Sequence, residues 1–307
     1  MPSSRRQFLG HSSVLVLAAL SGAALSPLTL AAEHPGLAEA VRNGERKLQG
    51  KIGVSLLDTD TGMGWSHRGD ERFAMCSTFK VLACSAILKQ VDDGRLSLTQ
   101  RLTFNQQDVV SYSPISKAFA GKPEGMSLGE ICHAAMTYSD NTAANLIISQ
   151  LGGPQAVTDF ARSIGDGVSR LDRWETALNT AIDNDPRDTT TPEAMTSNLQ
   201  RLLLGDVLST ASQQQLGQWL RDNTTGGSRI RKGIPETWQV GDKTGSGDNG
   251  TANDVAILWP PGQKPLLLSI YITQAKADWN ACSAVIAGIS AAIAAEYTAS
   301  HKPLISA

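Results

Sequence analysis

The sequence predicts an α/β protein with an antiparallel five-stranded sheet that is flanked by helices, built from both chain ends and interrupted by an inserted all-α domain. Strand patterns lie near the two ends of the chain, and helical spacing of apolar residues fills the middle. The predicted strands cover residues 52–57, 63–67, 237–244, 252–259 and 266–273. The turns within the N-terminal strand pair and between the three C-terminal strands are too short for a crossover, so these neighbours must pair antiparallel.

Most of the predicted helices lie between the strand-forming ends of the chain and make up a second domain. The predicted helices cover residues 38–48, 77–91, 127–138, 141–150, 155–164, 191–204 and 279–299. We therefore expect an α/β domain of residues 33–73 and 222–307, and an all-α domain of residues 74–221. The cleft between two such lobes is the natural place for a site.

Composition and the N-terminus narrow the class of protein. The chain has 307 residues, of which 41% are hydrophobic and 18% are charged, and its formal net charge is -2. No basic block indicates nucleic acid or a membrane surface. Arg5 and Arg6 followed by a short apolar stretch, with Ala31 and Ala32 as a cleavage site, indicate a twin-arginine-type signal peptide over residues 1–32. We therefore expect a periplasmic or secreted protein without a stable membrane anchor.

Cysteines and histidines do not indicate a metal site. The four cysteines are Cys76, Cys84, Cys132 and Cys282, and an exported protein can pair them, although spacing alone does not choose the pairs. The five histidines are scattered, without the short spacings that hold zinc. We expect no metal and no cofactor.

Ser77 and Lys80 form an S-x-x-K pattern at the start of a predicted helix. Residues three apart share a helical face, so Lys80 can reach Ser77, and a serine hydroxyl becomes a nucleophile when a neighbour takes its proton. Unpaired N–H groups at the helix start suit a developing oxyanion. The pattern alone is weak, because residue frequencies produce it about once in a chain of this length. A helix cap beside a solvent-facing lysine is the alternative.

Two further short motifs follow in order. Ser139, Asp140 and Asn141 lie between two predicted helices, where the alternative is an ordinary helix N-cap. Lys243, Thr244 and Gly245 end a predicted strand, where Gly245 would let a ligand approach the backbone closely. The order S-x-x-K, S-D-N, K-T-G is far more specific than any single motif, and it resembles the motif set of class A β-lactamases and penicillin-binding proteins.

The chain resembles the class A serine β-lactamases over nearly all of its mature length. Glu175, Leu178 and Asn179 match that family's E-x-x-L-N loop, and Tyr112 stands where the family has an aromatic cleft wall. The resemblance implies the serine β-lactamase and penicillin-binding-protein fold. It also implies hydrolysis of the lactam amide of penicillins and cephalosporins, and hence antibiotic resistance.

The resemblance also implies roles for individual residues. Ser77 attacks the lactam carbonyl, and either Lys80 or Glu175, acting through a water, takes its proton. Ser139 passes a proton to the lactam nitrogen, while Glu175 and Asn179 hold the deacylating water. The N–H groups of Ser77 and Ser246 form the oxyanion hole. The substrate-binding residues are Tyr112, Asn141, Arg229, Lys243, Thr244, Gly245 and Ser246.

Arg229 and the cysteines complete what the resemblance implies. Some relatives bring a substitute arginine to the carboxylate pocket from the segment that contains Arg229, and the alternative is an ordinary surface arginine like Arg231. A Cys84–Cys132 disulfide matches the positions bridged in some members, which would leave Cys76 and Cys282 free. The expected ligands are β-lactam antibiotics and serine β-lactamase inhibitors, bound by a monomer.

Two rival functions use the same motifs. A cell-wall D,D-peptidase also acylates its serine, and a non-enzymatic receptor domain is acylated by antibiotic and stays so. Both would lack Glu175 and Asn179, and both are often tethered to a membrane. Cys76 directly precedes Ser77, but Gly247 stands where carbapenem-hydrolysing relatives have its bridging cysteine, so that bridge cannot form.

Overall fold

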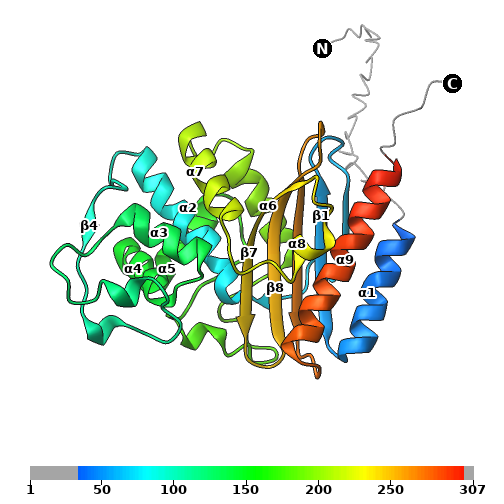
Figure 1. Ribbon diagram of the computed structural model, residues 1–307, viewed down its shortest axis with the longest axis horizontal. Helices are drawn as coiled ribbons and strands as arrows, with labels where there is room; N and C mark the ends of the chain where they lie inside the picture. The colour runs from blue at the N-terminus through cyan, green and yellow to red at the C-terminus, as the bar shows by residue number, and fades with distance from the viewer. Residues whose placement is uncertain (1–33, 301–307) are drawn as a thin grey trace, which may run out of the picture. The chain divides into compact units, whose positions relative to one another are not determined.

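The computed structural model describes residues 34–300, and all of these belong to one compact unit. The predicted signal peptide, residues 1–32, lies outside the described residues. Within residues 34–300, the fold is a central β-sheet with helices on both faces (Figure 1).

The sheet has five antiparallel strands in the order β2-β1-β9-β8-β7. The strands are β1 (Lys51–Asp58), β2 (Gly64–His67), β7 (Gln239–Gly247), β8 (Thr251–Trp259) and β9 (Leu266–Thr273). Both chain ends contribute, because β1 of the N-terminal hairpin pairs with β9 along its whole length. The predicted fold class is confirmed. Short two-stranded ladders join β3 (Phe73–Ala74) to β6 (Thr189–Thr190) and β4 (Arg101–Leu102) to β5 (Met126–Ser127).

Strand β7 is longer than the sequence predicts. We expected the strand to end at Thr244, but it continues through Ser246 to Gly247, since Ser246 pairs with Ala252 and Gly247 with Thr251. The K-T-G motif therefore lies inside a strand. β7 is also an edge of the sheet, so one side of its backbone has no neighbouring strand, and its residues Thr244, Gly245 and Ser246 line a cavity.

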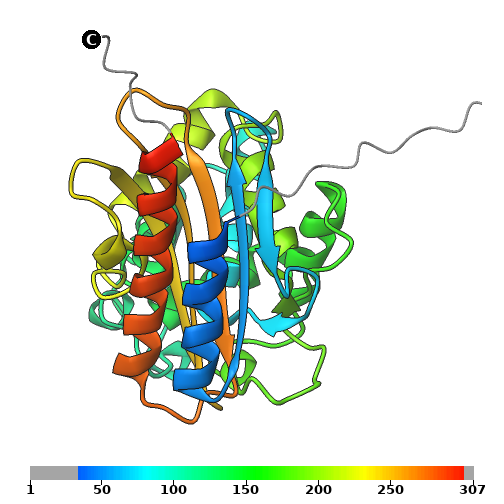
Figure 2. The same ribbon diagram turned by 90° about the vertical axis from the view of Figure 1, so that its right-hand side faces the viewer.

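One face of the sheet is covered by the helices nearest the two chain ends (Figure 2). These are α1 (Pro35–Leu48), α8 (Ile230–Gly233) and α9 (Trp279–Ser300), and α9 packs against α1, α8 and β8. By length and composition α9 is apolar enough to cross a membrane. Its inward side chains, among them Ile286 and Ile289, are buried in the core with those of the sheet, which accounts for its apolar character.

The helices of the middle of the chain gather on the other side of the sheet (Figure 1). They are α2 (Phe79–Asp92), α3 (Leu128–Thr137), α4 (Asn141–Leu151), α5 (Pro154–Ser163), α6 (Pro192–Leu203) and α7 (Thr210–Arg221). Their apolar faces share one core with Val255, Ile257 and Leu267 of the sheet. The division of the chain into separate α/β and all-α domains stays a prediction.

The sequence prediction missed α7. Its first half, with three consecutive glutamines, carries little apolar periodicity, but Leu216, Trp219 and Leu220 are spaced to face the core, and all three are buried. Ser209 caps the helix by accepting a hydrogen bond from Ser212 N, a local signal that the sequence contained.

The four cysteines are buried free thiols in the structure, and the Cys84–Cys132 disulfide stays a prediction for oxidising conditions. The two residues are nevertheless neighbours on α2 and α3, with Cys84 Sγ 3.9 Å from the Cys132 carbonyl oxygen. Burial, with a hydrogen bond from the Cys84 thiol, raises the pKa of the Cys132 thiol.

Candidate active site

Ser77 lies in a 3₁₀ turn, η1 (Cys76–Thr78), that leads directly into α2. Its side chain opens into a cavity, and its Oγ lies 3.5 Å from Glu175 Oε1. The turn packs tightly on β7, because a Cβ on Gly245 would stand 2.8 Å from the Met75 carbonyl oxygen. The glycine of the K-T-G motif is therefore required by the chain's own packing, and the close approach of a ligand to its backbone stays a prediction.

Lys80 lies one helical turn after Ser77, fully buried among acceptors. Its Nζ donates to Ser139 O and to Asn141 Oδ1, each at 2.8 Å, and lies 3.1 Å from Glu175 Oε1. Among residues 34–300 no hydrogen bond joins Lys80 to Ser77. The ammonium thus connects three of the predicted motifs, and its contact with the nucleophile runs through Glu175.

The S-D-N motif contains both a helix cap and two side chains that face the cavity. Asp140 caps α4 by accepting from Ala143 N at 2.9 Å, and its other oxygen accepts from Ile115 N and Ser116 N. Ser139, in a left-handed conformation with φ of 57°, and Asn141 face the cavity instead. A capping aspartate therefore holds two cavity-facing side chains on either side of it.

Both the side chain and the backbone of Glu175 are held by hydrogen bonds to asparagines. Its side-chain Oε2 accepts from Asn179 Nδ2 at 2.6 Å, and its backbone forms a pair of hydrogen bonds with the amide of Asn145. The sequence prediction missed Asn145. It lies four residues after Asn141, hence on the same side of α4, and this spacing was the available signal.

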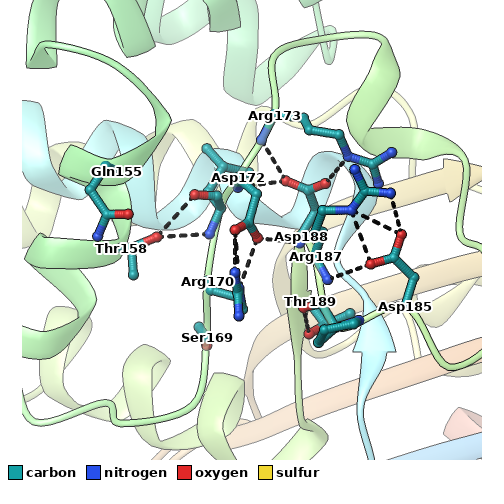
Figure 3. A network of polar contacts seen from close by, with 12 residues as sticks. Gln155, Thr158, Ser169, Arg170, Asp172, Arg173, Asp185, Arg187, Asp188 and Thr189 are labelled. Carbon is teal, nitrogen blue, oxygen red and sulfur yellow. Dashed lines mark hydrogen bonds and ion pairs between the residues drawn. The ribbon is translucent and has the colours of Figure 1, made fainter.

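The loop that carries Glu175 is closed by a polar network at its base (Figure 3). Asp188, which is fully buried, accepts from the backbone N–H groups of Asp172 and Arg173 at 2.7 and 2.9 Å and pairs with the Arg173 guanidinium. Asp172 pairs with Arg170 and accepts from Asp188 N at 3.0 Å. Asp172 and Arg173 therefore both fasten the loop to Asp188.

Lys243 extends from β7 toward Ser139, and Thr244 contacts Thr225. Lys243 Nζ donates to Ser139 Oγ at 2.9 Å, and the side chain is fully buried. Burial, reinforced by repulsion from Lys80, lowers the pKa of Lys243 to about 7. Thr244 Oγ1 lies 2.5 Å from Thr225 Oγ1, a partner that the sequence prediction did not include.

Arg229, at the start of α8, lines the cavity beside Thr244 and Ser246. It is only 1% exposed, and its Nη1 donates to the carbonyl oxygens of Gly245 and Asn253 at 2.8 and 2.6 Å. Its Nη2 donates to Ser246 Oγ at 2.7 Å. Arg231 does not resemble an exposed surface residue either, because its guanidinium pairs with the buried carboxylate of Asp242.

Many of the predicted site residues line one cavity of about 350 Å³, whereas Lys80, Glu175 and Lys243 are buried and are not among its lining residues. Tyr112 forms part of its wall with 60% of its surface exposed, so it is not a core aromatic. The lining also includes Trp279, which the sequence prediction missed. The cavity is lined by Ser77, Tyr112, Ser139, Asn141, Asn179, Thr225, Arg229, Thr244, Gly245, Ser246 and Trp279.

Known proteins match this chain over most of its sequence. A family model for the β-lactamase enzyme family matches residues 36–297. The chain belongs to the class A β-lactamase family. It is 49% identical to β-lactamase OXY-2 of Klebsiella oxytoca over 83% of this chain and 89% of the relative. It is 47% identical to β-lactamase CTX-M-97 of Escherichia coli over 87% and 91%.

A solved structure agrees with the fold of this β-lactamase. The class A β-lactamase reconstructed for the last common ancestor of Gram-negative bacteria superposes with a TM-score of 0.84 at 52% identity. The match covers 85% of this β-lactamase and 99% of the ancestral chain. The enzyme is therefore a serine hydrolase that acts on β-lactams, as its motifs predict.

Proposed function

We propose that this enzyme hydrolyses penicillins and cephalosporins through an acyl-enzyme on Ser77. The observation that carries the proposal is the position of Glu175, whose Oε1 lies 3.5 Å from Ser77 Oγ and 3.1 Å from Lys80 Nζ. One carboxylate thus adjoins both the nucleophile and the buried cation. This arrangement favours Glu175 over Lys80 as the group that receives the Ser77 proton, directly or through a water.

In the first half of the reaction, Ser77 Oγ bonds to the lactam carbonyl carbon as its proton leaves toward Glu175. The N–H groups of Ser77 and Ser246 stabilise the oxyanion, and the open edge of β7 supports this role for Ser246. Collapse of the intermediate breaks the C–N bond, and Ser139 delivers a proton to the nitrogen. The contact of Ser139 Oγ with Lys243 Nζ, at 2.9 Å, supports a proton path along these residues.

In the second half, Glu175 and Asn179 hold a water that attacks the ester. The 2.6 Å hydrogen bond between Asn179 Nδ2 and Glu175 Oε2 leaves Oε1 directed toward Ser77, where such a water would stand. Asn141 binds the substrate's side-chain amide beside Tyr112. The substrate carboxylate is bound by Thr244, Ser246 and Arg229, and Lys243 lies behind them.

We also propose that the enzyme acts outside the cytoplasm as a monomer and contributes to antibiotic resistance there. The signal peptide predicted for residues 1–32 supports export by the twin-arginine route. In an oxidising compartment the adjacent thiols of Cys84 and Cys132 would be able to form a disulfide.

The proposal is tested with purified mature protein and nitrocefin. We expect rapid turnover that a chelator does not slow, and loss of turnover in Ser77→Ala, with the fold retained by circular dichroism. Mass spectrometry at early times should place a penicillin adduct on Ser77. An adduct on another serine, or turnover that the chelator abolishes, would contradict the proposed mechanism.

A further inference from the structure

Trp279 is an exposed aromatic side chain inside the active-site cavity. It begins α9, where Asp278 Oδ1 caps the helix by accepting from Ala281 N at 2.8 Å. Trp279 is 50% exposed, although it lines the same cavity as Ser77 and Thr244. A large apolar side chain left accessible at the edge of a cleft is available for ligand contact.

The indole of Trp279 contacts residues that we assign to binding of the substrate carboxylate. Its ring centroid lies 5.1 Å from Arg229 Cζ, a cation–π contact, and its Nε1 lies 3.4 Å from Ser246 Oγ. Arg229 Nη2 donates to that same hydroxyl at 2.7 Å. Indole, guanidinium and hydroxyl therefore form one unit, and a group bound to Arg229 and Ser246 must lie beside the indole.

We propose that Trp279 is a specificity-determining residue that contacts the C3 substituent of cephalosporins and favours aromatic substituents there. In a cephalosporin the carboxylate is carried by C4, the ring carbon bonded to C3. The C3 substituent consequently lies next to whatever binds the carboxylate. The inference rests on the proposed function, because that function assigns the carboxylate to Arg229, Thr244 and Ser246.

The chemistry of an indole sets the expected preference. A flat aromatic substituent gains an offset-stacked or edge-on contact with it, whereas a methyl group covers little of its surface. A cationic substituent is disfavoured, because the Arg229 guanidinium already places positive charge against the indole. Neutral aromatic groups are therefore the substituents that Trp279 selects.

The test uses two cephalosporins that share the 7-thienylacetamido group and carry methyl or phenylthiomethyl at C3. We expect wild-type kcat/KM to favour the phenylthiomethyl compound. Trp279→Ala should lower that preference by about three- to tenfold, the range expected for one aromatic contact. Trp279→Phe should keep most of the preference, because it retains an aromatic face.

Tyr112→Ala provides the matched control from the other wall of the cavity. It should lower kcat/KM for both compounds by a similar factor and leave their ratio unchanged. A ratio in Trp279→Ala equal to that of the wild type would overturn the inference, even if both rates fell, since Trp279 would then act only by holding Arg229. Failure of the wild type to hydrolyse either compound would instead refute the proposed function.

Discussion

Lys80 Nζ and Glu175 Oε1 lie 3.1 Å apart, and neither side chain is exposed to solvent. Removing one partner of a buried ion pair leaves the other charge uncompensated, which commonly costs about 3–5 kcal/mol. Lys80 also donates to Ser139 O and Asn141 Oδ1, so part of its charge remains satisfied when the carboxylate is lost. Substitutions at Glu175 should therefore affect stability as well as chemistry, and an experiment must separate the two.

Glu175→Ala and Glu175→Gln should slow both steps but deacylation more, because Lys80 can still take the Ser77 proton whereas no other motif carboxylate can activate the deacylating water. We expect a burst of nitrocefin cleavage followed by very slow turnover, with a stable penicillin adduct on Ser77 detected by mass spectrometry. The glutamine variant keeps the volume of the side chain and serves as the control for lost packing. Normal steady-state turnover in the glutamine variant would remove Glu175 from the mechanism.

Arg229→Ala should weaken recognition of the substrate carboxylate. A hydrogen bond to a charged group contributes about 1.5–3 kcal/mol, so kcat/KM for benzylpenicillin should fall roughly ten- to hundredfold. Inactivation by clavulanate, which carries the same carboxylate, should slow in parallel.

The control for Arg229 must be chosen from the structure. Arg231→Ala is unsuitable, because it would leave the buried Asp242 carboxylate without its cation. Arg95, on the surface beside Asp93, is a suitable substitute, and Arg95→Ala should change neither quantity. Equal, near-zero effects in Arg229→Ala and Arg95→Ala would show that Lys243 and the hydroxyls bind the carboxylate unaided.

Binding of a carboxylate substrate should draw a proton onto Lys243 at mildly alkaline pH. The pKa of Lys243 is lowered to about 7, so at pH 8 the free enzyme is mostly neutral there, and a bound anion raises this pKa. Calorimetry of benzylpenicillin binding to Ser77→Ala, compared in phosphate and Tris, should give an uptake approaching about one proton at pH 8.

The pH dependence of this proton uptake follows from the lowered pKa of Lys243. Below the free-enzyme pKa the lysine is already charged, so uptake should disappear near pH 6. Adding Lys243→Arg should abolish uptake at both values, since a guanidinium stays protonated. Binding enthalpies that do not depend on the buffer at pH 8 would contradict the prediction.

Cys84 and Cys132 should be joined when the protein is isolated from an oxidising compartment. Their residues are neighbours, and a bridge between them typically contributes about 2–4 kcal/mol to the free energy of unfolding. Non-reducing peptide mapping should recover the linked peptides, with Cys76 and Cys282 as free thiols. Reduction should lower Tm without changing nitrocefin turnover. Two unmodified thiols at Cys84 and Cys132 in such material would refute the pairing.

The sequence by itself determined the fold class and most of the elements around the cavity. Apolar periodicity is a local property, so the five strands and the helices next to Ser77, Ser139 and Asn141 were predictable from short segments. The motifs also identified Lys80, Glu175 and Lys243, because their order along the chain is specific. The motifs also located the glycine of K-T-G, and the structure adds a packing reason for it, since it makes room for the Met75 carbonyl oxygen.

Only the tertiary structure decided which of these residues touch. Glu175 meets Ser77 because Asn145, Asn179 and the network around Asp188 hold its loop against the cavity. Trp279 meets Arg229 because α9 packs beside α8 and β8, although the two residues are far apart along the chain. No local pattern contains such pairs. Contacts between distant segments follow from how whole faces of helices and sheet pack, which only the folded chain specifies.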